Sequence, residues 1–247
     1  MFIDLDLYTV IIMIIGISLG GFLKGVISFG FPLVALPILS LALPPKPAIF
    51  LLFFSLIFVN IRELKVGNWR SYKKIAPLAL GIFIGIIFGS IIFHNVESEF
   101  ISKMIGITIV VSAIINFYGI KINKNLLENK IFTLIYGLCS GVIGGMTTIV
   151  GPLIVIYLVS LNLKKEVFSE LVSLSVFSTI APLYGIFFVY QSLTLNDFLV
   201  SAIFVIPAIL MQLLGFKIRK VIPQSIFKNI VLIILVIIGL LVLYKNW

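Results

Sequence analysis

The most informative stretch of the chain is GGFLKGVISFGFPLVALP, residues 20–37, because a later stretch follows the same pattern. The later stretch is GLCSGVIGGMTTIVGPLIVIYL, residues 137–158. Both read Gly-x-x-x-Gly-Val-Ile, followed by an interruption and then by glycine, proline and leucine at the start of a short apolar arm. The interruption is about four residues longer in the second copy. Because glycine and proline break helices, the two stretches predict two interrupted helices.

The composition around these motifs is too apolar for a soluble protein. Of the 247 residues, 61% are hydrophobic and 11% are charged, and the mean hydropathy is +1.27. Soluble domains usually contain about 45–50% apolar and roughly 25% charged residues. We therefore expect an all-α polytopic membrane protein, with residues 1–247 forming a single transmembrane domain.

Ten hydrophobic segments account for most of the chain. A helix that crosses a bilayer needs about 20 apolar residues. The segments near that length are 8–27, 47–62, 75–93, 101–118, 167–190, 197–215 and 227–244. The shorter segments are 33–43, 131–143 and 153–163, and we expect these to be half-helices, tilted fragments or re-entrant arms shielded by protein.

The two motifs divide the chain into two repeats of five segments, residues 8–118 and 131–244. Because five is odd, the second repeat must enter the membrane from the opposite side. In transporters built from inverted repeats, interrupted helices indicate where the binding site lies. The alternative interpretation is that Gly-x-x-x-Gly and Gly-Pro only pack and kink ordinary helices.

The basic residues predict how the chain is oriented. Most of the 18 Lys and Arg residues lie in the loops 62–74, 119–130, 164–165 and 216–228, whereas the intervening loops are mainly acidic. Under the positive-inside rule these loops face the cytoplasm. We therefore expect a multi-pass protein of the cell (plasma) membrane with both termini outside the cytoplasm. The net charge of +9 is spread over short loops, so it does not indicate a nucleic-acid partner.

On the two glycine-rich stretches quoted above, the sequence resembles the TauE/SafE family of membrane permeases, from about residue 10 to 244. The second stretch is the closer match. In the first, the chain has Ser28-Phe29-Gly30-Phe31 where many members have several consecutive glycines. The resemblance implies a transporter of sulfite, sulfoacetate or related organosulfonates, acting in export or uptake.

An anion that crosses the bilayer needs donors that replace its hydration shell, and backbone N–H groups at helix N-termini can supply them. Pro32 and Pro152 suit the first position of a helix because proline has a fixed φ and no N–H. We therefore expect a substrate site formed by Lys24, Gly25, Ser28, Gly30, Pro32, Gly144, Gly145, Met146, Thr147, Thr148, Gly151 and Pro152.

Two ionisable residues within the apolar segments have alternative interpretations. Lys24 is either a counter-charge for the anion or a side chain that extends to the inner interface. Glu170 is either a proton carrier for coupled transport or a carboxylate that interacts with the positive end of its helix.

Three classes of function remain to be compared. The leading hypothesis is a secondary transporter of small sulfur-containing anions, in which one repeat or bundle rocks around a midplane site. An anion channel, or a transporter of another small carboxylate or oxyanion, is the alternative. An enzyme is disfavoured because the sequence offers no Ser–His, Asp–Asp or His–His constellation. We expect no cofactor and no metal, and a small anion and membrane lipid as partners, and the sequence leaves a homo-oligomer open.

Overall fold

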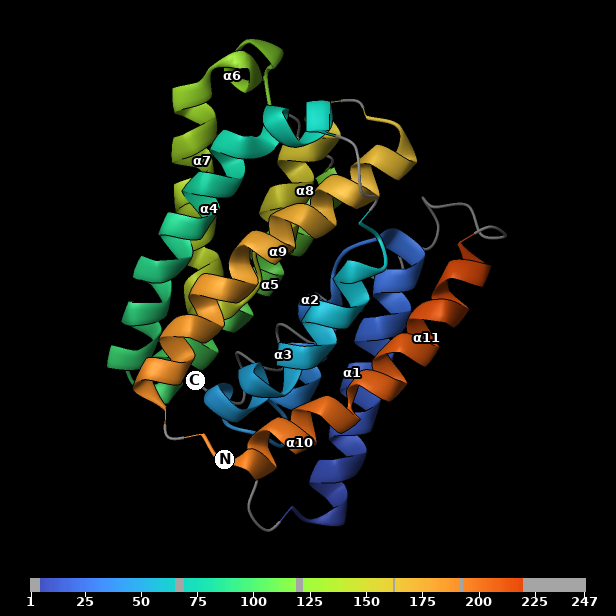
Figure 1. The fold of residues 1–247 in the computed structure, drawn as a ribbon. Helices are drawn as coiled ribbons and strands as arrows, with labels where there is room; N and C mark the ends of the chain where they lie inside the picture. The colour runs from blue at the N-terminus through green and yellow to red at the C-terminus, as the bar shows by residue number, and fades with distance from the viewer. Residues whose placement is uncertain (1–4, 65–68, 119–121, 162, 192, 220–247) are drawn as a thin grey trace.

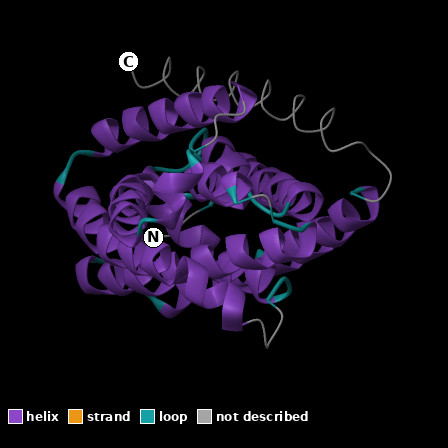
Figure 2. Ribbon diagram, turned by 90° about the horizontal axis from the view of Figure 1, so that it is seen from above, coloured by secondary structure: helices purple, strands orange, loops and turns teal. Residues whose placement is uncertain are grey.

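A computed structural model of the chain describes residues 5–64, 69–118, 122–161, 163–191 and 193–219 (Figure 1). Throughout these ranges the chain forms helices joined by loops, with no strand (Figure 2), so the predicted all-α class is confirmed. The helices are α1 (Leu7–Ile27), α2 (Phe31–Leu39), α3 (Pro45–Ile61), α4 (Trp69–Asn95), α5 (Ser98–Tyr118), α6 (Lys124–Glu128), α7 (Lys130–Thr147), α8 (Gly151–Ser160), α9 (Lys165–Tyr190), α10 (Leu195–Ile203) and α11 (Val205–Ile218).

Several of these helices are long and apolar enough to cross a membrane. Within the described residues there are five such stretches: Leu7–Ile27, Ile75–Asn95, Lys130–Thr147, Val167–Tyr190 and Leu195–Ile218. Helices α3 and α8 are shorter and also apolar. The chain is thus a multi-pass membrane protein. The predicted segment 227–244, and residues 65–68, 119–121 and 220–228 of the basic loops, lie outside the described residues.

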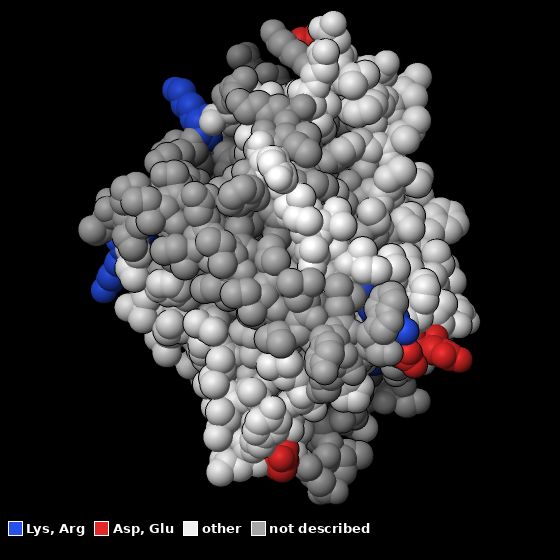
Figure 3. All heavy atoms as spheres, turned by 180° about the vertical axis from the view of Figure 1, so that it is seen from behind, with Lys and Arg blue, Asp and Glu red and all other residues white. Residues whose placement is uncertain are grey.

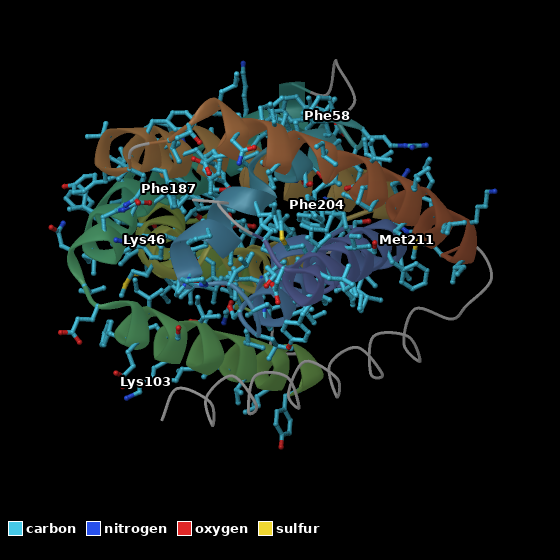
Figure 4. All side chains as sticks on the ribbon, turned by 90° about the horizontal axis from the view of Figure 1, so that it is seen from below. Lys46, Phe58, Lys103, Phe187, Phe204 and Met211 are labelled. Atoms are coloured by element: carbon cyan, nitrogen blue, oxygen red, sulfur yellow. The ribbon has the colours of Figure 1, made fainter. Side chains whose placement is uncertain are left out.

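The exterior of the bundle is apolar, as a lipid environment requires. Large side chains such as Phe88, Leu210 and Val189 are 57%, 56% and 79% exposed. Among the described atoms of the face drawn in Figure 3, most are uncharged, and the Lys, Arg, Asp and Glu side chains in view lie mainly toward the edges. On α5, Lys103 points away from the bundle (Figure 4) and pairs with Glu99 at 2.9 Å.

One predicted short segment is wrong. The run 131–143 was expected to be too short to span, but α7 extends over Lys130–Thr147 and is long enough. The helix continues through Gly144 and Gly145 because packing against α4 stabilises it: Gly145 lies against the carbonyl oxygen of Ile86. Tertiary packing here overrides the low helix propensity of glycine.

The run 197–215 was expected to be one segment, and the structure divides it into α10 and α11 at Phe204. Pro207 explains the division, because proline has no N–H to bond the carbonyl of Ile203 four residues earlier. Figure 4 shows Phe204 at this junction. Together α10 and α11 still cover the length of a membrane span.

Helices α4 and α7 pack backbone to backbone along two rows of glycines, which we call the α4–α7 seam. Its glycines are Gly81, Gly85 and Gly89 on α4 and Gly137, Gly141 and Gly145 on α7. A Cβ added to Gly85 would meet the carbonyl oxygen of Leu138, and one added to Gly141 would meet that of Ile82. Rows of small residues allow this close approach between membrane helices.

Helices α1 and α11 form a second close contact, the α1–α11 seam. A Cβ on Gly21 would meet the backbone of Ala208, and one on Gly25 would meet that of Gln212. The Gln212 side chain donates from Nε2 to the carbonyl of Val59 at 2.8 Å, which ties α3 to the same seam. Each seam thus joins a helix from the first half of the chain to one from the second half.

Candidate functional site

The two glycine-proline motifs form helix breaks with the same local geometry. Helix α1 is followed by Ser28 at φ 71° and α7 by Thr148 at φ 59°, both in the left-handed region. The N–H of Ser28 donates to the carbonyl of Lys24 at 2.9 Å, and that of Thr148 to the carbonyl of Gly144 at 2.6 Å. Residues other than glycine rarely adopt this φ. At both breaks the left-handed residue ends the preceding helix with the same capping hydrogen bond.

The interruptions have the same length, contrary to the sequence comparison. Residues 28–30 separate α1 from α2, and residues 148–150 separate α7 from α8. The extra residues in the second copy form another turn of α7 instead of a longer loop. In the corrected alignment Ser28 corresponds to Thr148, Pro32 to Pro152 and Lys24 to Gly144.

Both breaks line one small cavity inside the protein, with a volume of about 30 Å³. Helices α3, α4 and α9 complete its walls. The lining residues are Lys24, Phe29, Gly30, Phe31, Pro32, Leu33, Leu56, Asn60, Ile86, Gly144, Thr148, Ile149, Val150, Gly151, Pro152, Val176, Thr179 and Leu183. The wall is therefore apolar apart from a few polar side chains and the two helix starts.

The starts of α2 and α8 offer backbone donors to this cavity. The first hydrogen bonds of the two helices run from Val34 N to the carbonyl of Gly30 and from Ile154 N to the carbonyl of Val150, each 3.2 Å. The preceding N–H groups, on Phe31, Leu33, Gly151 and Leu153, have no acceptor among the described residues. Such groups, at the positive end of a helix, favour a bound anion.

The prolines lie one position later than expected. Helix α2 begins at Phe31 and α8 at Gly151, so Pro32 and Pro152 are second residues, not first. Proline also suits the second position, because the N–H of that residue has no partner within a helix either. Gly30, at φ 88°, occupies a conformation that side chains disfavour.

Seven of the twelve residues expected at the site line the cavity: Lys24, Gly30, Pro32, Gly144, Thr148, Gly151 and Pro152. The other five do not. Gly25 faces α11 and Gly145 faces α4 across the seams. Met146 lies outside the lining. The Thr147 hydroxyl donates to the carbonyl of Ile143 at 2.8 Å and accepts from Ile149 N at 3.2 Å, while the Ser28 hydroxyl shares a 2.7 Å hydrogen bond with that of Ser169.

Lys24 is buried and paired with a carboxylate. Its side chain is 2% exposed, and its Nζ lies 3.1 Å from Oε2 of Glu63. It therefore does not extend to solvent, and in this arrangement its charge is already compensated. Sequence reasoning missed Glu63 because it placed that residue in a basic cytoplasmic loop.

Glu170 belongs to a different contact. It lies in the second turn of α9, is 2% exposed, and accepts a hydrogen bond from the Tyr72 hydroxyl. Burial and the adjacent Glu170 raise the pKa of Tyr72 to about 12, so this hydroxyl remains a donor at neutral pH. The position is too far into α9 for Glu170 to cap the helix start.

Two polar cavity residues were also missed. Asn60 donates from Nδ2 to the carbonyl of Leu56 at 2.7 Å, and its Oδ1 is buried with no partner in the described part of the chain. The Thr179 hydroxyl donates to the carbonyl of Val176 at 2.7 Å. The signal for Asn60 was present as a lone amide in an apolar run, a pattern that more often indicates helix packing.

A polytopic helical protein in which two broken helices meet at a buried cavity has the architecture of a membrane transporter. Over the described ranges, no group of three or more His, Cys, Asp and Glu side chains is placed to hold a metal ion. The sequence matches the sulfite exporter TauE/SafE family over residues 12–242. The chain belongs to this family of membrane transporters for sulfur-containing anions, and the predicted resemblance is confirmed. Comparisons with curated proteins and with solved structures gave no match.

Proposed function

We propose that this protein is a secondary transporter that moves sulfite, sulfoacetate or a related organosulfonate across the cell membrane by alternating access. The observation that carries the proposal is the single cavity into which the starts of α2 and α8 both open. Two helix N-termini with unpaired N–H groups supply a positive potential without a permanent net charge. Membership in the TauE/SafE family supports the class of substrate.

The contacts of the anion follow from the lining of the cavity. The backbone at Gly30, Pro32, Gly151 and Pro152 surrounds it, with Gly144 and Thr148 beside it. The five predicted site residues outside the lining act indirectly, by holding the two breaks in place: Gly25, Ser28, Gly145, Met146 and Thr147. Lys24 contributes charge only when it is released from Glu63.

The proposal includes two inverted repeats, residues 8–118 and 131–244. Helices α1, α2 and α3 are matched by α7, α8 and α9. The distance in sequence from the start of α2 to the start of α8 equals the distance from the start of α3 to the start of α9. The packing partners fit a two-fold axis between the repeats. The first helix of repeat 1, α1, packs against α11 of repeat 2, and the first helix of repeat 2, α7, packs against α4 of repeat 1. The basic loops support an orientation with both termini outside the cytoplasm.

The direct test is uptake into proteoliposomes that contain the purified protein. We expect saturable uptake of labelled sulfite or sulfoacetate, with thiosulfate and sulfate in the same panel to define the class of anion. A small carboxylate such as acetate tests the alternative substrate, and ohmic currents in planar bilayers would indicate a channel instead. Protein-free liposomes are the control, and absence of uptake for every anion would contradict the proposal.

Gly151→Val tests the role of the helix start separately from folding. A Cβ on Gly151 meets nothing within 4 Å, and the residue lines the cavity, so the valine enters empty space beside the unpaired N–H groups. We expect anion uptake to fall about tenfold or more, equivalent to about 1.4 kcal/mol of binding, with an unchanged melting temperature.

The matched control is Gly185→Val, because Gly185 also has nothing within 4 Å of an added Cβ but lies exposed on α9. It should retain wild-type uptake. Equal uptake by both variants would show that the α8 start does not contact the anion.

A further inference from the structure

All three N–H groups of the Lys24 ammonium are already used. Its Nζ donates to the carbonyl of Ser28 at 2.7 Å, to Oγ of Ser173 at 3.0 Å and to Oε2 of Glu63 at 3.1 Å. An ammonium has three donors, so none is left for a ligand. Since Lys24 also lines the cavity, an anion can reach its charge only by displacing one of these acceptors.

Among these acceptors, Glu63 is the one whose negative charge a change of protonation can remove. Its side chain is 5% exposed, and Oε2 also accepts from Ser173 Oγ at 2.8 Å. Its other oxygen, Oε1, is buried with no hydrogen-bond partner among the described residues. A buried carboxylate oxygen without a donor is unfavourable, and a proton placed on it removes the charge.

The other charged groups around this pair are engaged elsewhere. Arg219, after α11, donates to Ser169 Oγ at 2.9 Å, and the Arg62 guanidinium lies over the Phe216 ring, 5.3 Å from its centroid. Glu170 on α9 accepts from Tyr72 of α4. Lys24 is therefore the one described cation that borders the cavity, and Glu63 is the carboxylate that neutralises it.

We propose that Glu63 couples transport to protons, and this inference rests on the proposed function. One proton binds at Oε1 of Glu63, the ion pair opens, and the Lys24 ammonium turns to the anion in the cavity. Loss of the proton restores the carboxylate, which competes with the anion for Lys24 and promotes its release. In the paired state the two charges cancel, whereas protonation leaves one positive charge for the substrate.

The test compares Glu63→Gln with wild type and with Glu170→Gln, the matched change at the other buried carboxylate. Each variant is reconstituted in proteoliposomes with the membrane potential clamped at zero, and labelled sulfoacetate is the probe. At one proton per anion, a gradient of one pH unit, acidic outside, drives up to about tenfold accumulation. We expect wild type and Glu170→Gln to accumulate the probe.

For Glu63→Gln we expect loss of accumulation, while exchange of probe at equal pH proceeds at least as fast as in wild type, because the charge of Lys24 then has no counter-ion at any pH. Glu63→Asp keeps a titratable carboxyl and should retain a response to the gradient; it provides the test if Glu63→Gln does not fold. Gradient-driven accumulation by Glu63→Gln, or its loss only in Glu170→Gln, would overturn the proposal. Wild-type exchange without any pH response would also overturn it, whereas absence of wild-type transport would contradict the proposed function instead.

Discussion

Replacing Gly85 with leucine is expected to separate α4 from α7 and to leave little folded protein. A Cβ at this position would meet the carbonyl oxygen of Leu138 and lie 2.8 Å from the backbone nitrogen of Val142. Overpacking a close-packed interior costs about 1–3 kcal/mol and sometimes more. Because both obstacles are backbone atoms that cannot rotate away, we expect the upper end of this range or beyond. Size-exclusion profiles and melting temperature in detergent measure the effect.

Gly185→Leu is the control for this prediction. The same substitution is made in another helix, at an exposed position where an added Cβ meets nothing within 4 Å. It should give a single monodisperse peak and an unchanged melting temperature. A Gly85→Leu protein with the same behaviour would mean that the α4–α7 seam is looser than described.

Lys24→Met is expected to have the second-largest effect, on both stability and transport. Methionine keeps most of the length of the side chain but leaves Glu63, 5% exposed, without its counter-ion. Removing one partner of a buried ion pair costs about 3–5 kcal/mol, because the remaining charge is uncompensated. We therefore expect a clear drop in melting temperature, and loss of anion uptake because the charge that borders the cavity is gone.

The double variant Lys24→Met/Glu63→Met distinguishes the two effects. Replacing both members of a buried pair by apolar residues is often neutral or stabilising, so most of the lost stability should return. Transport should not return, since neither charge is restored. A double-mutant cycle in the free energy of unfolding gives the coupling energy between the two residues. Additive single effects would show that the pair contributes no net interaction.

The sequence was sufficient to predict the features that depend on local patterns. Apolar runs place the helices, and Gly-Pro dipeptides mark helix starts, so the breaks near Pro32 and Pro152 were found. The meeting of both breaks at one cavity followed from comparing the two motifs. The apolar runs and the Gly-Pro dipeptides lie within a few residues of the features that they predict, which is why the sequence alone indicates those features.

Apart from the meeting of the two repeated motifs, features that depend on contacts between distant segments were not predictable. Gly144 and Gly145 suggested an early break, but α4 keeps that part of α7 helical. Glu63 belongs to a loop rich in basic residues, and its partner Lys24 lies 39 residues earlier in the chain. No local pattern shows that a charge at the end of α3 is buried against α1 and α9.

The two seams restrict which parts of the protein can move as units. Each seam places backbone against backbone, leaving no side-chain layer along which the paired helices could slide. Since α1 is locked to α11 and α4 to α7, the N-terminal and C-terminal halves of the chain cannot swing apart as separate bodies. The conformational change between inward-open and outward-open states must therefore move units that each contain helices from both halves. The hinges between these units lie outside the glycine rows.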